Sequence, residues 1–492
     1  MALDNVRAFL GAIDAAGQLA RVTRPVSVDK EMTEIADRCM KSPEGGPALL
    51  FECPTLLAGG ASPYAVAVNL FGSERRMALA LGVERLDDVG ERIAELLNLK
   101  VPEGLLGKLA MLPKLAEVAK FPPKTIGGRA PCQELVLQGS DIDLSCFPVP
   151  VCWPEDGGPY ITLPGVITRD PKTGVRNVGM YRIQVLGKAD LAMHWQRHKV
   201  GTAHWRAIAE RDETMPVAIA LGGDPASIYA ASAPLPPTID EFLFAGFLRK
   251  EPVRLAKAVT CDLEVPAEAE IVIEGFIDLH EDLVLEGPFG DHTGFYSLAD
   301  YYPKVHVTAI TMRPEPVWPH TIVGRPPMED YWLGHATERI FLPLLKLTLP
   351  EIVDLHMPAE GIFHNLVFVS IDKQFPGQAY KVMNGLWGQG LMALAKVIVV
   401  LDKEVNVRDP KEAWWVALNH IDPERDVRFS MGPIDVLDHS SRGFTYGSKM
   451  GIDATRKWKE EGFTREWPNR IVMDEGTKAR VDAMWRDLGI EL

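Results

Sequence analysis

Apolar residues in the N-terminal part of the chain alternate between two spacings. Val6 and Phe9 begin a pattern of helical period, whereas 64–70 is a short and largely apolar run of strand length. Proline and glycine then concentrate in 121–129, a composition that suits neither a helix nor a strand. We therefore predict a small N-terminal α/β domain over residues 1–125.

The middle of the chain has a different pattern. Runs rich in β-branched residues, such as 269–277, recur between turn residues and predict strands. One insertion, 240–249, has helical spacing, and Asp240 is placed to cap this helix, so that Glu241 would lie in its first turn. The pattern predicts a mostly β domain over residues 126–322.

Helix and strand periods alternate again toward the C-terminus, which predicts an α/β domain over residues 323–470. The last segment, 471–492, has apolar residues such as Met484 and Trp485 on one face of a terminal helix. This face needs a partner surface, which either the chain's own core or another subunit could supply. The chain as a whole is predicted to be an α/β (α+β) protein.

Charge and composition exclude several classes of protein. The 492 residues include 52 Lys and Arg against 67 Asp and Glu, and without a local basic cluster the net charge of −15 argues against binding of nucleic acid. The apolar runs are shorter than the roughly 18 residues that span a bilayer. The N-terminus lacks the basic start of a signal peptide, and the cysteines form no CxxC pair, so we expect a cytoplasmic protein without a disulfide framework.

The densest candidate chemistry is the segment LEGPFGDHTGF at 285–295. Glu286 and Asp291 flank a Gly-Pro-Phe-Gly turn that can direct both carboxylates into one cavity. If they are close and buried, their pKa values would be pushed apart, and one acid could donate a proton near neutral pH. An ordinary turn with solvated acids would have the same sequence.

Polar residues also crowd the segment that begins RNVGMYR. Asn177 and Arg182 have an odd spacing, which on one strand would place them on opposite faces, Asn177 toward a metal or phosphate and Arg182 toward a substrate cavity. His194 and His198 are candidate ligands, although a histidine in a polar stretch is more often hydrogen-bonded at the surface. Glu241 alone would be interpreted as an acid that interacts with a helix dipole.

Taken together, the order and spacing of these segments resemble the UbiD family of prenylated-flavin-dependent decarboxylases. The resemblance extends over essentially the whole chain, and it is closest to the branch that acts on 3-polyprenyl-4-hydroxybenzoate in ubiquinone biosynthesis. It implies a central flavin-reductase-like split β-barrel and a terminal oligomerisation helix. The motifs that carry it are WPEDGGPYIT (153–162), RNVGMYR (176–182), DLEVPAEAEIVIEG (262–275), EGPFGDHTGFY (286–296), GRPP (324–327) and GSKMGIDATRKW (447–458).

The resemblance implies the reversible, non-oxidative decarboxylation of an aromatic or other α,β-unsaturated carboxylic acid, with prenylated FMN as the cofactor. Arg182, Glu286 and Asp291 match the catalytic Arg-Glu-Glu/Asp set of the family. By this match, Arg182 would hold the substrate carboxylate or pair with Glu286, and Asp291 would donate the proton.

The resemblance also implies a metal ion on the cofactor phosphate. Asn177, His198 and Glu241 would bind Mn²⁺ or Mg²⁺, and carbonyl groups near 230–233 would suit K⁺. The residues implied to contact the prenylated FMN are Asn177, Met180, Tyr181, Arg182, His194, Trp195, Gln196, Lys199 and Val200.

The implied partners are an aromatic carboxylic acid, a flavin prenyltransferase that supplies the cofactor, and further copies of the chain in a dimer or hexamer. A polyprenylated acid would require a long apolar channel or a groove beside a membrane, with peripheral membrane association, whereas a small acid requires a closed pocket. Two other classes of protein remain as alternatives, a flavin-dependent oxidoreductase and a non-enzymatic scaffold. The oxidoreductase has no evident need for the three charged groups Arg182, Glu286 and Asp291. The scaffold would not bind flavin.

Overall fold

The N-terminal part of the chain forms a small sheet covered by helices. In the computed structural model, which describes residues 2–97, 118–195, 200–209 and 214–490, the strand order of this sheet is β1-β3-β5-β22. Asn5 caps the first helix by accepting from Ala8 N at 2.9 Å, and the apolar face of that helix packs on the sheet. The elements are α1 (Val6–Ala15), β1 (Leu19–Val22), β2 (Val26–Ser27), α2 (Glu31–Met40), β3 (Ala48–Phe51), β4 (Pro54–Thr55), β5 (Val66–Val68), α3 (Glu74–Leu81) and α4 (Asp87–Leu97).

The fourth strand of this sheet comes from far along the chain. Strand β22 (Trp318–His320) pairs in parallel with β5 and follows all the central strands in sequence. The N-terminal sheet is therefore completed by a segment that lies beyond the central sheet.

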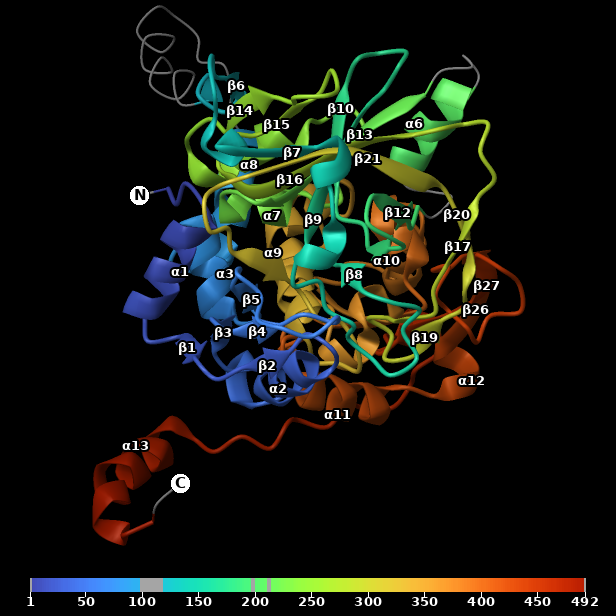
Figure 1. Cartoon of the computed structure of the whole chain (residues 1–492). Helices are drawn as coiled ribbons and strands as arrows, with labels where there is room; N and C mark the ends of the chain where they lie inside the picture. The colour runs from blue at the N-terminus through green and yellow to red at the C-terminus, as the bar shows by residue number, and fades with distance from the viewer. Residues whose placement is uncertain (1, 98–117, 196–199, 210–213, 491–492) are drawn as a thin grey trace, which may run out of the picture.

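The central part is an antiparallel sheet that curls into a half-barrel (Figure 1). Its order is β10-β9-β13-β16-β21-β12-β11-β8, and β7 pairs with β21. The strands are β7 (Leu135–Gln138), β8 (Tyr160–Ile161), β9 (Pro164–Arg169), β10 (Arg176–Gly179), β11 (Ile183–Val185), β12 (Asp190–Met193), β13 (Met215–Gly222), β16 (Ala269–Ile277) and β21 (Lys304–Met312).

Shorter elements surround this sheet. Two two-stranded ribbons, β17-β20 and β18-β19, carry the acidic segment, and a small sheet β15-β14-β6 lies at one edge. These elements are β6 (Lys124–Thr125), α6 (Val200–Ala209), α7 (Pro225–Ala230), α8 (Glu241–Arg249), β14 (Arg254–Lys257), β15 (Glu264–Pro266), β17 (Val284–Glu286), β18 (Phe289–Gly290), β19 (Tyr296–Ser297) and β20 (Asp300–Tyr302).

The described residues 176–195 depart from their sequence-based interpretation. We expected one strand to carry both Asn177 and Arg182, but β10 ends at Gly179, and Arg182 lies in the break before β11. The argument from opposite faces of one strand is therefore wrong. The backbone is irregular in this break, where Met180 N donates to Ala231 O at 2.8 Å, so no strand period sets the position of Arg182.

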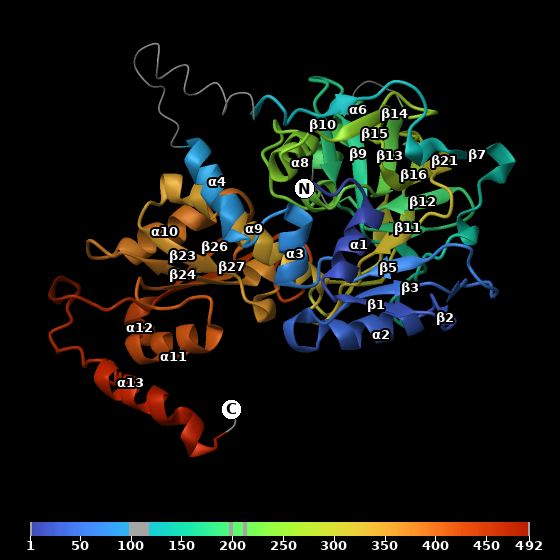
Figure 2. The same ribbon diagram turned by 90° about the vertical axis from the view of Figure 1, so that its left-hand side faces the viewer.

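The C-terminal part has its own sheet, of order β23-β24-β25-β27-β26. Helix α9 lies between this sheet and the N-terminal elements (Figure 2), and α10 and α11 pack against β25. The elements are α9 (Glu329–Thr348), β23 (Ile352–His356), β24 (Leu366–Ile371), α10 (Gln378–Trp387), β25 (Val397–Asp402), α11 (Pro410–His420), α12 (Pro423–Asp426), β26 (Val427–Pro433), β27 (Tyr446–Asp453) and α13 (Glu475–Met484).

The terminal helix lies apart from the rest of the molecule. In both ribbon views an extended segment leads to α13, and none of its residues is buried. In the extended segment, Ile471 is fully exposed and Val472 is largely exposed. Met484 and Trp485 are partly exposed. Within the described residues, no helix is both long and apolar enough to cross a membrane.

Candidate active site

Three charged side chains from separate strand ends meet beside the central sheet. Glu286 ends β17, Asp291 follows β18, and Arg182 lies between β10 and β11. The Arg182 guanidinium donates from Nε and Nη2 to the two carboxylate oxygens of Glu286, at 2.9 and 3.1 Å, and from Nη1 to Asp291 Oδ2. Ser297 Oγ accepts a further bond from Nη2 at 2.9 Å. The fold thus brings together the three residues predicted to be catalytic.

These side chains are buried and charged. The side chain of Glu286 is 0% exposed and that of Arg182 is 7% exposed. Burial by itself would raise the pKa of Glu286, but the hydrogen bond from His194 and the charge of Arg182 outweigh it and lower the pKa to about 2. Burial would also raise the pKa of Asp291, and the charge of Arg182 and the hydrogen bond from His292 lower it instead.

The expectation that the two acids push their pKa values apart is therefore wrong for the protein without ligands. Both Glu286 and Asp291 are paired with the same guanidinium, and the charge of Arg182 lowers the pKa of each acid. A cation shared in this way favours the ionised form of both acids.

His292 was absent from the predicted set, although it directly follows Asp291 in the GDHTG motif. Its Nδ1 lies 2.9 Å from Asp291 Oδ1, and its backbone N donates to the same oxygen at 2.7 Å. Burial would lower the pKa of His292, but the hydrogen bond to Asp291 and the charge of that carboxylate raise it, with help from Asp330. The ring of Phe363 lies 5.4 Å from the imidazole, so the C-terminal part contributes an aromatic wall beside the acid.

His194 and Trp195, which follow β12, each have a nitrogen available for a ligand. His194 Nδ1 lies 2.9 Å from Glu286 Oε2, and the imidazole packs on Tyr302 with ring centroids 4.3 Å apart. His194 Nε2 and Trp195 Nε1 are buried and have no hydrogen-bond partner among the described residues. A buried polar atom without a partner is costly, so both nitrogens suit a polar ligand such as a flavin.

The other residues predicted to contact the cofactor occupy the same region in part. Tyr181 Oη accepts from Asn177 Nδ2 at 3.4 Å, and Met180 precedes Tyr181 in the irregular segment between β10 and β11. Val200 begins α6. Ala231 O, in the predicted potassium segment, accepts the hydrogen bond from Met180 N. The predicted residues Gln196, His198 and Lys199 lie outside the described residues.

Glu241 occupies the position predicted for it, as the first residue of α8. Asp240 caps this helix by accepting from Phe242 N at 2.8 Å. Glu241 Oε2 accepts from Val178 N, also at 2.8 Å, which places its carboxylate beside the strand that carries Asn177. Burial raises the pKa of Glu241 to about 7, and backbone hydrogen bonds offset only part of this effect. Hard divalent cations bind carboxylate and amide oxygens, so the side chains of Glu241 and Asn177 suit such an ion.

Family models match most of the chain. The models for the N-terminal, Rift-related and C-terminal domains of 3-octaprenyl-4-hydroxybenzoate carboxy-lyase match residues 10–96, 124–326 and 331–454, respectively. An uncharacterised protein of Aquifex aeolicus is 53% identical over 98% of this chain and 98% of its own length.

Solved structures agree with this match. The UbiD-class enzyme HmfF from Pelotomaculum thermopropionicum, in complex with FMN, is 29% identical over 96% of this chain and 98% of its own, with a TM-score of 0.80. An evolved dimeric form of HmfF contains prFMN. The vanillic acid decarboxylase of Sedimentibacter hydroxybenzoicus, in its closed form, is 27% identical over 98% of each chain, with a TM-score of 0.83. The predicted α/β (α+β) fold is confirmed, and the central domain, for which the resemblance implied a split β-barrel, has a sheet curled into a half-barrel.

Proposed function

This chain belongs to the UbiD family of carboxy-lyases. From this premise, we propose that it decarboxylates a hydroxybenzoate with prenylated FMN as its cofactor. The substrate would be 3-polyprenyl-4-hydroxybenzoate or a related aromatic acid. The observation that carries this proposal is the buried set of Arg182, Glu286 and Asp291, in which one guanidinium serves two carboxylates.

Arg182 is the group that receives the substrate carboxylate. A guanidinium fork binds a carboxylate through parallel hydrogen bonds, so an incoming acid competes with the acids already bound. Glu286 holds the guanidinium through two hydrogen bonds, whereas Asp291 uses one nitrogen. The bond to Asp291 is therefore the one that exchanges when the substrate binds.

This exchange prepares Asp291 to act as an acid. Loss of the Arg182 contact removes one of the effects that lower the pKa of Asp291, while burial still acts to raise it. His292 is hydrogen-bonded to the same carboxylate and supplies the proton. When carbon dioxide leaves, a C–H bond replaces the broken C–C bond on the ring carbon, and the proton for it comes from Asp291. His292 then regains a proton from solvent.

The chain also has groups that suit the cofactor. Prenylated FMN, when bound, supplies the electron acceptor that decarboxylation requires. His194 Nε2 and Trp195 Nε1 would donate to or accept from its polar atoms, because no described residue satisfies them. Asn177 and Glu241, together with His198, would hold Mn²⁺ or Mg²⁺ on the phosphate, and carbonyl groups near 230–233 would hold K⁺.

A small aromatic acid without a polyprenyl tail is the second candidate substrate. Phe363 lies against His292, and an aromatic wall beside the acid suits a flat ring. The similarity to a vanillic acid decarboxylase supports the same candidate. Peripheral membrane association would follow only from the polyprenylated substrate.

The exposed terminal segment supports assembly with a second copy. Apolar residues including Ile471 and Val472 are exposed in the part of the chain that the structure describes. We include a homo-oligomer, a dimer or a hexamer, in the proposal, together with a flavin prenyltransferase as the source of the cofactor. Size measured by light scattering, before and after deletion of residues 471–492, tests the assembly.

A carbon-dioxide release assay tests the activity. The protein is matured with a flavin prenyltransferase and offered hydroxybenzoates with and without prenyl tails. We expect release from at least one hydroxybenzoate by protein with prenylated FMN and none by protein with FMN alone. Equal release with FMN alone would contradict the proposed cofactor, and the preferred tail length separates the two substrate candidates.

A further inference from the structure

A second group of buried histidine and carboxylate side chains lies in the C-terminal part. His335 and Glu338 are one helical turn apart on α9, and His356 ends β23. Their ligand atoms all lie within 4.8 Å of one another. The side chain of Glu338 is 0% exposed, and those of His335 and His356 are 11% and 5% exposed. This group shares no residue with the Arg182 site.

The distances within the group suit a metal ion. His335 Nδ1 and His356 Nδ1 lie 2.8 and 2.9 Å from the same oxygen, Glu338 Oε1. A tetrahedral zinc ion bonded at about 2.0 Å would hold such atoms roughly 3.3 Å apart. Small side-chain rotations are therefore enough to admit the ion.

One of these nitrogens lacks a hydrogen bond. His335 Nδ1 is close to Glu338 Oε1 but not aligned with it, and this buried atom has no hydrogen-bond partner among the described residues. Glu338 is held in place by Met357 N, which donates to its other oxygen at 2.6 Å. Arg339 Nε lies 3.4 Å from Glu338 Oε1 and is itself buried without a hydrogen-bond partner among the described residues, while Nη1 of the same guanidinium donates to Asp354. A metal ion at Glu338 would therefore compete with this guanidinium for the carboxylate.

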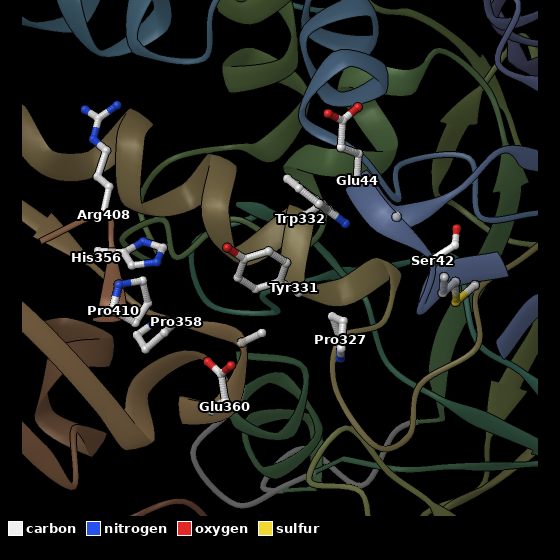
Figure 3. Close-up of a pocket in the computed structure, with 13 residues that line it drawn as sticks. Ser42, Glu44, Pro327, Tyr331, Trp332, His356, Pro358, Glu360, Arg408 and Pro410 are labelled. Carbon is white, nitrogen blue, oxygen red and sulfur yellow. The ribbon is translucent and has the colours of Figure 1, made fainter. Parts of the chain in front are cut away.

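The group borders a cleft that gives access to solvent. His356 lines a cleft of about 270 Å³, in which α9 residues face the N-terminal segment (Figure 3). Glu44, Glu360 and Arg408 also line it, and the guanidinium of Arg408 is paired with Asp354 and Asp87. The two glutamates therefore add negative charge that attracts cations. Tyr331 lines the cleft as well, and its ring stacks on His335.

We propose that His335, Glu338 and His356 form a site for a divalent transition-metal ion, best suited to Zn²⁺, whose remaining coordination position faces this cleft. Two imidazoles and one carboxylate with an open position are the donor set of many zinc sites. The ion would join α9 to β23. This proposal does not depend on the proposed decarboxylase activity or on the metal at Glu241.

Zinc binding to the full-length protein with its cofactor tests the site. After treatment with a chelator, the protein is titrated with Zn²⁺ in competition with a coloured chelator, and bound metal is counted. We expect E338Q and H335Q each to lose one equivalent of zinc, or to bind it at least about tenfold more weakly. H420N is the matched control, because His420 is a partly buried histidine of α11 outside the group.

Cobalt provides a second measurement. Co²⁺ at a site of low coordination number gives an intense visible band, which we expect in the parent protein and in E241A but not in E338Q. H335Q keeps the test valid if E338Q does not fold, because Glu338 also accepts a backbone hydrogen bond. Unchanged zinc binding in H335Q and in folded E338Q, or only the weak spectrum of hydrated Co²⁺ in the parent, would overturn the proposal and leave the group as a hydrogen-bonded network.

Discussion

Glu286 and Glu241 are two glutamates beside the same central sheet, and their surroundings shift their pKa values in opposite directions. Burial acts to raise both values. For Glu286, His194 and Arg182 reverse this effect and bring the pKa to about 2. For Glu241, the nearby Arg176 offsets little, and the pKa rises to about 7. Arg176 is itself paired with Asp240 and Glu264.

The difference indicates which of the two regions has its negative charge balanced by the protein's own side chains. The Arg182 cluster contains its own counter-charge, so it is stable as a set of ions and can exchange one partner for a substrate carboxylate. Beside Glu241, the charge of Arg176 is already paired with Asp240 and Glu264, so this carboxylate would favour an added cation. The first region suits the reaction, and the second suits retention of the cofactor.

Asp291→Asn should have the largest effect and should separate the two regions most clearly. The amide is nearly isosteric but cannot deliver a proton, and general acid catalysis contributes about 10²–10⁴-fold. We expect kcat to fall by that factor while flavin content stays unchanged. Asp300→Asn, which alters an exposed acid of β20, is the control. If Asp291→Asn had the parent kcat with its cofactor intact, the proton donor would be another group.

Acid titration should reveal the charge balance at Glu286. Its folded-state pKa lies below its ordinary value of 4.5, so its stabilising effect is complete above pH 4.5 and is lost as the pH falls toward about 2. The shift corresponds to about 3 kcal/mol. Urea unfolding across this range should give a smaller loss of stability in Glu286→Gln than in the parent.

Glu52→Gln serves as the control for this titration, because Glu52 pairs with Arg21 at the surface. Its unfolding free energy should follow the parent's dependence on pH. Parallel curves for Glu286→Gln and the parent would show that Glu286 is not held as a buried anion.

Arg182→Lys should weaken binding of the substrate acid by about 10–100-fold. An ammonium group cannot reproduce the two parallel hydrogen bonds of the guanidinium, and a hydrogen bond to a charged group contributes about 1.5–3 kcal/mol. The dissociation constant for a non-reacting substrate analogue, measured by calorimetry, checks this. Arg169→Lys, at a more exposed ion pair, should bind like the parent. Unchanged affinity in Arg182→Lys would remove Arg182 from the proposed carboxylate site.

Glu241→Ala should have the smallest effect on chemistry and a distinct effect on cofactor content. Loss of one anionic ligand should weaken retention of the divalent metal by about tenfold or more, and flavin content should fall with it. Asp240→Ala removes the cap of α8 but leaves the carboxylate of Glu241, so it separates helix destabilisation from ligand loss. If Glu241→Ala had the same metal and flavin contents as the parent, Glu241 would not serve retention of the cofactor, and the proposed roles of the two regions would be wrong.

Local features of the chain were predictable where neighbouring residues decide the structure. Asp240 caps α8 and Glu241 begins it, as expected, because capping depends on a few consecutive residues. The segment between Glu286 and Asp291 is not the simple turn that we expected, because Phe289–Gly290 form β18 and pair with β19. Both acids nevertheless reach Arg182. The resemblance of several motifs at consistent spacing was enough to identify the family.

Only the tertiary structure decided what these residues contact. Arg182 reaches Glu286 and Asp291 across more than a hundred positions of sequence, and its charge reverses the expected pKa pattern. Phe363 packs on His292 from the C-terminal part, and β22 completes an N-terminal sheet. Sequence periodicity indicates which face of an element is apolar. The pKa values and the geometry of the site depend instead on which distant groups are buried together. Packing of the whole chain determines this.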